Sequence, residues 1–270
     1  MKLAFVALAF MLPAPAFAEC TIADAMLKSA YPNAQQGDNG LLVDGGSFQR
    51  AIQPENVVCK AWPWRPELML AAVPLLEAKP AEEGMNKGDV EILVTDRTGK
   101  PLARRIEPGM AFSDAIRFGD IGLDTARYDI REGQRAFGLR TTQSGSSRVN
   151  PYGEQALWLY TFDKGRIERV LDGLVVEHGL GENDGNCQGE YTMVKRTVTL
   201  GPKASSGYRT LGVEQTETLS TSQPTADDCV SKERPGKSAR FALTYDKGRY
   251  RLPGKASSDG LFSTIEIGEQ

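Results

Sequence analysis

The chain has 270 residues, of which 40% are hydrophobic and 25% charged, and its 32 basic and 35 acidic side chains leave a net charge of −3. This much apolar material excludes a disordered chain, which lacks the side chains needed to offset the entropy lost on folding. The sequence has no run of basic residues, so we do not expect a nucleic-acid partner. The 28 glycines and 15 prolines favour many turns over long helices.

The first residues have the pattern of a secretory signal peptide. Lys2 precedes ten apolar residues, 3–12, and Ala16 and Ala18 form a cleavage site of small residues. A helix of that length spans about 15 Å, half the hydrocarbon core of a bilayer, so we expect no permanent membrane anchor. We predict a signal peptide at 1–18 that is removed on export and a mature protein in the periplasm.

Export determines how the four cysteines are interpreted. Disulfides are the default state of cysteines in an oxidising compartment, and four cysteines can pair in three ways. The simplest pairing joins the two early and the two late cysteines, Cys20 with Cys59 and Cys187 with Cys229. No Cys-x-x-Cys pattern occurs, so we do not expect a zinc or redox site.

A single short helix is predicted after the signal peptide, over 21–30. Thr21 is a suitable N-cap, Asp24 follows three residues later, and Tyr31 and Pro32 end the apolar periodicity. We expect 19–54 to contain this helix and a linker.

The rest of the chain consists of short β-prone runs separated by turn residues. Three stretches share a hairpin pattern in which an apolar strand reaches an aspartate, a glycine follows two or three residues later, and the next strand begins with basic residues. Glycine adopts positive φ and aspartate bonds to its own turn, so the pattern predicts tight turns. The stretches are 91–106, 157–170 and 241–252.

These hairpins divide 55–270 into about three four-stranded meanders, 55–106, 121–176 and 190–253. We therefore predict an all-β fold with one short N-terminal helix, in which antiparallel meanders form propeller-like blades or stacked sheets. The run 157–162 is apolar on both faces, so we expect it to be a central strand that is covered on both sides.

The sequence contains no recognisable catalytic motif. Neither a Gly-x-Ser-x-Gly elbow, a His-Glu-x-x-His pair nor a phosphate-binding glycine loop occurs. His178, the only histidine, ends an apolar strand without an evident nucleophile beside it, which favours a structural role. We expect a protein without catalytic residues and without a cofactor, unless calcium binds.

Calcium is the one cofactor that a segment of the chain suggests. The glycine-rich loop 181–190 concentrates oxygen-bearing side chains at Glu182, Asp184, Asn186 and Glu190. Their order does not match a known calcium loop, and asparagine, aspartate and glycine are also ordinary turn formers. The alternative is a long loop held down by Cys187.

Two further segments are candidates for binding. Trp62, Trp64 and Arg65 lie among prolines, and the two indoles could form a platform for a sugar or fill the core beneath Cys59. Arg140, Arg148 and Tyr152 lie in a polar stretch between two predicted strands, which suits an interface loop and equally a solvated hairpin loop.

These observations favour a non-catalytic periplasmic binding protein that engages another macromolecule, most simply an envelope protein, through its loops. An inhibitor or immunity-type protein is the specific form that we expect. The alternatives are a cell-wall or glycan-binding module that uses Trp62 and Trp64, and a hydrolase whose site is assembled from distant carboxylates. Fold alone does not separate them.

Overall fold

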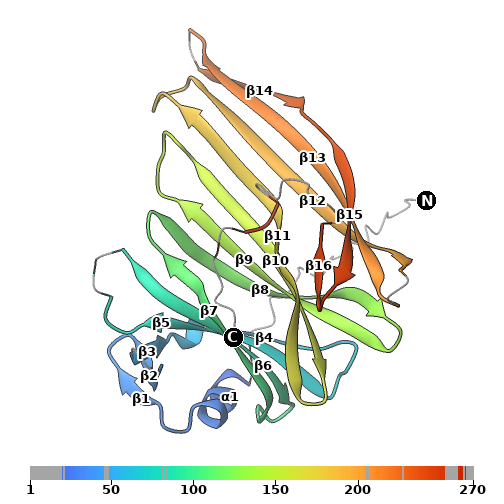
Figure 1. Ribbon diagram of the computed structural model, residues 1–270. Coiled ribbons are helices and arrows are strands. Elements are labelled where there is room, and N and C mark those ends of the chain that lie inside the picture. Colours follow the sequence, from blue (N-terminus) through green and yellow to red (C-terminus); the bar gives the residue numbers. More distant parts are fainter. Residues whose placement is uncertain are drawn as a thin grey trace, which may run out of the picture.

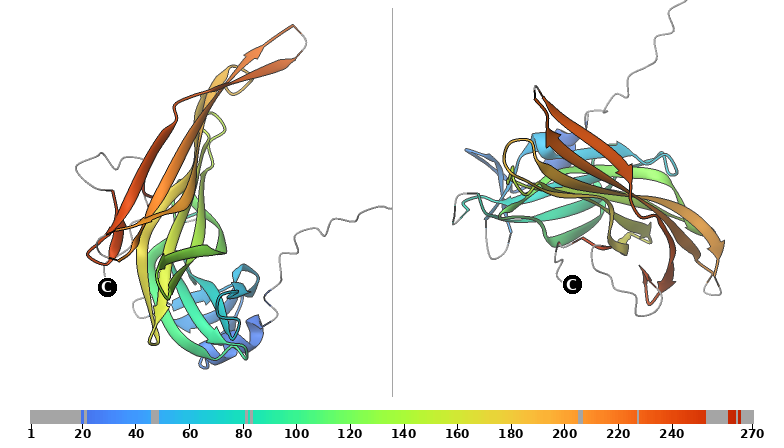
Figure 2. Two further views of the ribbon diagram at one scale, coloured as in Figure 1. Left: turned by 90° about the vertical axis from the view of Figure 1, so that its right-hand side faces the viewer. Right: turned by 90° about the horizontal axis from the view of Figure 1, so that it is seen from above.

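The chain folds into two antiparallel sheets that cross and pack face to face over part of their length (Figures 1 and 2). The computed structural model describes residues 20, 22–45, 49–80, 82, 84–204, 207–226, 228–252, 261–263 and 265. Within these residues the sheets contain seven and nine strands, and the only α-helix is short. The predicted all-β class is thus confirmed. The predicted signal peptide, 1–18, lies outside the described residues.

The first sheet follows the N-terminal helix and has the order β1-β2-β3-β5-β6-β7, with β4 paired to β5 beside β3. Helix α1 packs on its outer face, where Arg104 donates to the carbonyl of Ala30 (2.7 Å) and to the buried carboxylate of Glu91. The bounds are α1 Ala23–Ala30, β1 Gln35–Gly37, β2 Gly40–Asp44, β3 Gln49–Ile52, β4 Val58–Ala61, β5 Leu68–Glu77, β6 Asn86–Asp96 and β7 Pro101–Ser113, with a 3-10 turn at Pro54–Asn56.

The second sheet has the order β16-β15-β13-β12-β11-β10-β9-β8, and β14 continues the line of β15 along β13. Its strands are long, and their far ends extend beyond the first sheet as an arm (Figure 2). The bounds are β8 Ile116–Arg131, β9 Gln134–Gly145, β10 Tyr152–Asp163, β11 Arg166–Asn183, β12 Gly189–Lys203, β13 Arg209–Pro224, β14 Cys229–Pro235, β15 Ala239–Asp246 and β16 Arg249–Arg251.

Strand β10 is buried on both faces, as its sequence predicts. Trp158 and Tyr160 face the core between the two sheets, whereas Leu157 and Leu159 face a second core on the opposite side. The second sheet curls around this second core, so that β16 comes close to β11 and the described C-terminal segment bridges Leu174 to Phe262. One strand therefore joins both cores.

The three predicted hairpin turns are present at the expected places. Asp96 accepts the backbone N–H of Thr98 (2.8 Å) and of Lys100 (3.0 Å), and Gly99 has a φ of 86°. In the other two hairpins the loop is a Lys-Gly pair with both residues at positive φ, Lys164-Gly165 and Lys247-Gly248. This is the two-residue turn whose twist matches that of the flanking strands.

Two features differ from the predicted organisation. The segment predicted as a linker contains β1, β2 and β3, which extend the first sheet. The predicted second and third meanders are not separate blades, because β11 pairs with β12 from Glu177 to Asn183 and joins them into one sheet. Residues 179–183 continue β11 although their glycines and asparagine are typical of a loop.

Both disulfides have the predicted pairing, Cys20–Cys59 and Cys187–Cys229. The first links the start of the described chain to β4, and the second links the β11–β12 loop to the start of β14. Two such bridges indicate an oxidising, extracytoplasmic location. None of the helices in the described part of the chain is long and apolar enough to cross a membrane.

Candidate functional site

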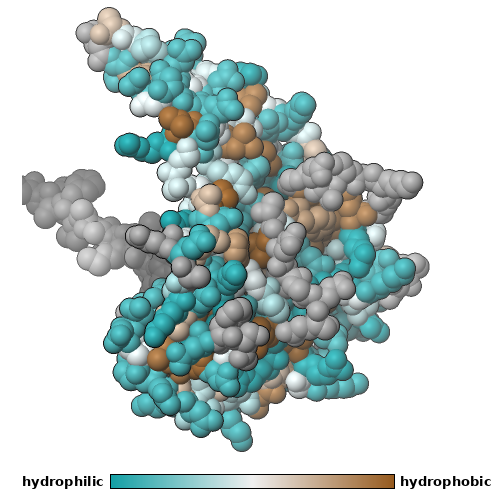
Figure 3. Space-filling model, turned by 60° about the vertical axis from the view of Figure 1, so that its left-hand side comes forward, coloured by the Kyte–Doolittle hydropathy of each residue, from teal (hydrophilic) through white to brown (hydrophobic). Residues whose placement is uncertain are grey.

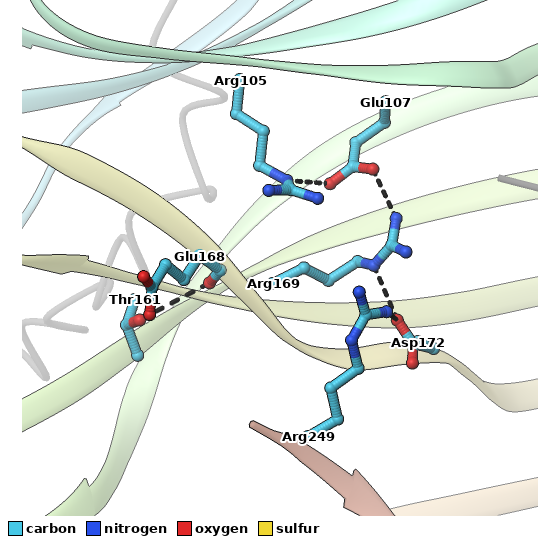
Figure 4. Close-up of polar contacts among 7 residues, drawn as sticks. All are labelled: Arg105, Glu107, Thr161, Glu168, Arg169, Asp172 and Arg249. Carbon is cyan, nitrogen blue, oxygen red and sulfur yellow. Dashed lines mark hydrogen bonds and ion pairs between the residues drawn. The ribbon is translucent and has the colours of Figure 1, made fainter. Parts of the chain in front are cut away.

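The most buried polar cluster is a chain of charges that links the two sheets (Figure 4). Glu107 on β7 is fully buried and contacts Arg105 (2.5 Å) as well as Arg169 of β11. Arg169 also pairs with Asp172 (2.6 Å), which in turn contacts Arg249 of β16. The charges therefore alternate from the core to the surface and connect β7, β11 and β16.

This cluster is built for structure. Both carboxylate oxygens of Glu107 are bound by guanidinium groups, those of Arg105 and Arg169. Burial and the negative charge of Glu107 raise the pKa of the Tyr160 phenol well above its ordinary value, so this hydroxyl stays protonated. The cluster connects strands β7, β11 and β16 and so links the two sheets.

The two predicted binding tryptophans lie in different environments. The segment 62–67 is a turn between β4 and β5, so the two side chains do not share the face of a strand. Trp62 is only 2% exposed and packs edge-on against Phe137, whereas Trp64 is 46% exposed with the Arg135 guanidinium over its ring. Arg65 pairs with Glu67 at 3.0 Å. A platform of two indoles is therefore not formed, and Trp62 belongs to the core.

The loops predicted at 140–152 and 181–190 meet at the far end of the arm. Asn183 donates its backbone N–H to the carbonyl of Val149 (2.8 Å), and Gly181 donates to the carbonyl of Pro151 (3.1 Å). The Cys187–Cys229 disulfide then fixes the second loop to β14. We call this region the tip and define it as residues 145–152, 180–191, 220–226 and 228–231.

The tip encloses an open cavity of about 470 Å³. Arg148, Glu182, Asn186 and Glu190 are among the residues that line it, together with both cysteines of the disulfide. None of the tip residues described is buried. Hydrophilic side chains cover most of the arm, and apolar ones form small separate groups (Figure 3).

Three aliphatic side chains of the tip are strongly exposed. Val149 is 42% exposed, Leu180 47% and Val230 42%, and they lie in three of the four tip segments. Sequence reasoning did not identify them, because an isolated aliphatic residue in a β-prone run normally indicates a buried strand face. Their position becomes evident only when the loops are brought together.

The tip is also acidic. Glu182 and Glu190 lie directly opposite each other on β11 and β12, and both are exposed. Like charges at such a position destabilise a strand pair. Asp184 and Asp228 add to the negative charge, whereas Arg148 is the only basic residue among those defined as the tip.

The calcium hypothesis finds no support at the tip. One oxygen of Asp184 accepts the backbone N–H groups of Asn186 (2.9 Å) and Gln188 (3.1 Å), which is ordinary turn chemistry. In the described part of the chain, no group of three or more histidine, cysteine, aspartate or glutamate side chains is arranged to hold a metal ion. The residues Glu182, Asp184, Asn186 and Glu190 do not form a ligand set.

The other predicted interface residues are held within the sheet. Arg140 lies in the middle of β9 and binds Asp124 (2.9 Å) and Gln155 (2.9 Å). Tyr152 donates to Glu154 (2.9 Å), and its ring meets that of His178 edge-on at 5.4 Å. Glu154 lies opposite His178 in the β10–β11 pair and is buried, so His178 is part of the sheet's polar packing.

Of the predicted site residues, the structure thus brings Arg148 together with the 181–190 loop at the tip. Trp64 lies elsewhere, beside a basic cavity at the other end of the same strands. Comparison of the chain with protein-family models, with curated proteins and with solved structures found no match.

Proposed function

We propose that this is a non-catalytic binding protein of the periplasm, which engages another envelope protein through its tip. Its specific form would be an inhibitor or immunity-type protein that covers a site on that partner. The observation that carries the proposal is an arm that ends in exposed aliphatic side chains and is fixed by a disulfide and by loop-to-loop hydrogen bonds.

The tip adds little to the stability of the fold. Burial of apolar surface is the main source of folding free energy, and the described tip residues contribute no buried side chain. The opposed pair Glu182 and Glu190 is unfavourable in the free protein. The tip is nevertheless held in place by a disulfide. Such rigidity suits a recognition surface, because it lowers the entropy lost on binding.

The composition of the tip defines the partner's surface. The tip as defined contains four carboxylates, three exposed aliphatic side chains and a single cation, Arg148. The complementary surface carries basic groups beside small apolar patches, and its positive charge also accelerates association at low salt. The tip cavity would accept a basic side chain of the partner between Glu182 and Glu190.

A photocrosslinking amino acid at Val230 tests the proposal. Leu102 on β7 is a matched control, because it is 45% exposed compared with 42% for Val230 and lies on the other sheet. We expect one envelope protein to crosslink from position 230 and not from position 102, and E182Q/E190Q in the same chain to weaken the product. Two outcomes would contradict the proposal: equal amounts of crosslinked product from positions 230 and 102, or no crosslinked product from position 230 in cells that express the protein.

A further inference from the structure

A second surface lies at the other end of the long strands. The turn after β4, the β8–β9 turn and the adjoining ends of β12 and β13 enclose a cavity of about 380 Å³. Its functional side chains are Trp64, Arg127, Arg131, Arg135, Lys203 and Arg209. Two carboxylates, Asp129 and Glu132, complete the charged lining.

The cavity is basic in a chain that is acidic overall. Five cations and two carboxylates leave a net charge of +3 in the lining, whereas the whole chain has −3. Asp129 is shared by Arg135 (2.5 Å) and Arg127 (2.7 Å), so one carboxylate serves two guanidinium groups. Lys203 and Glu132 are 3.8 Å apart and largely exposed, so water screens their attraction.

Of the four arginines that line the cavity, Arg131 and Arg209 have no carboxylate partner among the described residues. The guanidinium of Arg131 lies over the ring of Tyr208 at 5.3 Å, and the centroids of the stacked Tyr208 and Tyr245 rings are 3.6 Å apart. The guanidinium of Arg209 donates to the carbonyl of Gly201 (3.1 Å), and the backbone carbonyl of Arg209 accepts the hydroxyl of Tyr250 (2.8 Å). These contacts with neutral groups hold the two guanidinium groups in place without neutralising them, which lowers the entropy that they lose on binding an anion.

We propose that this cavity binds a small ligand through a phosphate group. A carboxylate would offset only one of the three excess charges, whereas a phosphate monoester carries about −1.5 to −2 and three acceptor oxygens. Arginine guanidinium groups match those oxygens in pairs. The exposed Trp64 ring supplies an apolar surface for the remainder of the ligand.

Size favours a small ligand over a macromolecule. The cavity volume lies within the range of small-molecule sites, about 300 to 1,000 Å³. The phosphate monoester could belong to a soluble sugar phosphate or to the headgroup of phosphatidic acid, and the two sources can be separated by experiment. The site is independent of the tip, which lies at the opposite ends of the strands.

Tryptophan fluorescence reports directly on this cavity. Trp62 and Trp158 are each 2% exposed, so acrylamide, a neutral quencher, acts mainly on Trp64. At constant ionic strength we expect glucose 6-phosphate to reduce the acrylamide quenching constant about twofold with saturation, and glucose to have no effect. Protection by vesicles that contain phosphatidic acid, whose headgroup is a phosphate monoester, and not by glucose 6-phosphate or phosphatidylcholine vesicles, would identify a lipid headgroup as the source.

Two variants complete the test. R131Q/R209Q should lower the affinity for the probe that protects Trp64 about tenfold or more, because hydrogen bonds between charged groups are stronger than those between neutral groups. R131K/R209K keeps both positive charges but cannot donate paired hydrogen bonds to phosphate oxygens, so we expect a smaller loss of affinity than in R131Q/R209Q. K28Q/K79Q removes two exposed charges elsewhere and should bind as the unchanged protein does. No protection by either probe, or equal protection in R131Q/R209Q, would overturn the proposal.

Discussion

Glu107 is a fully buried carboxylate at the contact between the two sheets. Its two oxygens are matched by Arg105 and Arg169 from different strands. The attraction between buried ions roughly offsets the cost of removing them from water. The ion pair of Glu107 and Arg169 therefore fixes how β7 and β11 are placed, and it adds little to the free energy of unfolding. Removal of one partner is different, because the remaining charge stays buried.

Replacement of Arg169 by methionine should therefore be costly. We expect R169M to lower the free energy of unfolding by about 3 kcal/mol, as measured by urea denaturation at neutral pH. E107Q/R169M should be less destabilised than the sum of the two single variants, because the double change removes the unpaired charge. Strict additivity in this cycle would show that the two side chains are not energetically coupled.

The tryptophans show what sequence reasoning could and could not resolve at single positions. The sequence leaves a binding platform and a place in the core open for both Trp62 and Trp64, and the structure buries Trp62 but exposes Trp64. The two side chains part because 62–67 is a turn and not a strand. The neighbour of Trp64, Arg135, is 71 residues away in the sequence, so no local pattern indicated their contact.

Among the strands, β14 depends most on a covalent link. All seven of its residues are exposed, and it pairs with β13 alone. An isolated edge strand without buried side chains is only marginally stable. The disulfide at Cys229 fixes its first residue to the β11–β12 loop, and charged residues along the strand discourage pairing with other chains.

C187S/C229S should consequently loosen the tip and little else. We expect faster hydrogen exchange of backbone amides in β14 and in the neighbouring end of β13, with no change in β5 and β6. The loss in global stability should stay below the roughly 4 kcal/mol of the chain-entropy model for a loop of this length, because the tip opens locally before the protein unfolds. Faster exchange throughout the first sheet would contradict this description.

Local chemistry predicted the hairpins but not the full extent of the strands. Asp96 and the Lys-Gly turns act within a few residues, so the sequence suffices to identify them. The predicted loop 181–190 includes the last residues of β11, because Gly181, Asn183 and Asp184 are residue types that form turns. In the folded chain the ring of Tyr191 lies against Gly179 and Gly181, where a Cβ atom would clash with it, and this cross-strand contact lets β11 continue.

Strand β10 of the second sheet contributes to both cores, and we therefore expect the fold to unfold as a single cooperative unit. Residues of β10 contribute to the core between the sheets and to the core inside the curl. We expect tryptophan fluorescence, which reports the first core, and far-UV circular dichroism, which reports both sheets, to give the same urea midpoint with the disulfides intact. Two separated midpoints would indicate independently folding sheets.

The charge distribution runs along the strands from an acidic tip to a basic cavity. Opposite ends of the long hairpins carry the four carboxylates of the tip and the five cations around Trp64. Sequence reasoning could not detect this separation, because each end is assembled from turns that are distant in the chain. The two ends of the strands therefore carry opposite net charge and would attract ligands of opposite charge.

The direct test of the tip as a recognition surface compares stability and partner affinity in E182Q/E190Q. Removal of the opposed carboxylates should raise the free energy of unfolding by about 0.5 kcal/mol, because like charges across a strand pair are unfavourable. The same variant should bind the partner crosslinked from position 230 at least tenfold more weakly in calorimetry. Unchanged affinity in a variant of equal or higher stability would contradict the role assigned to the tip.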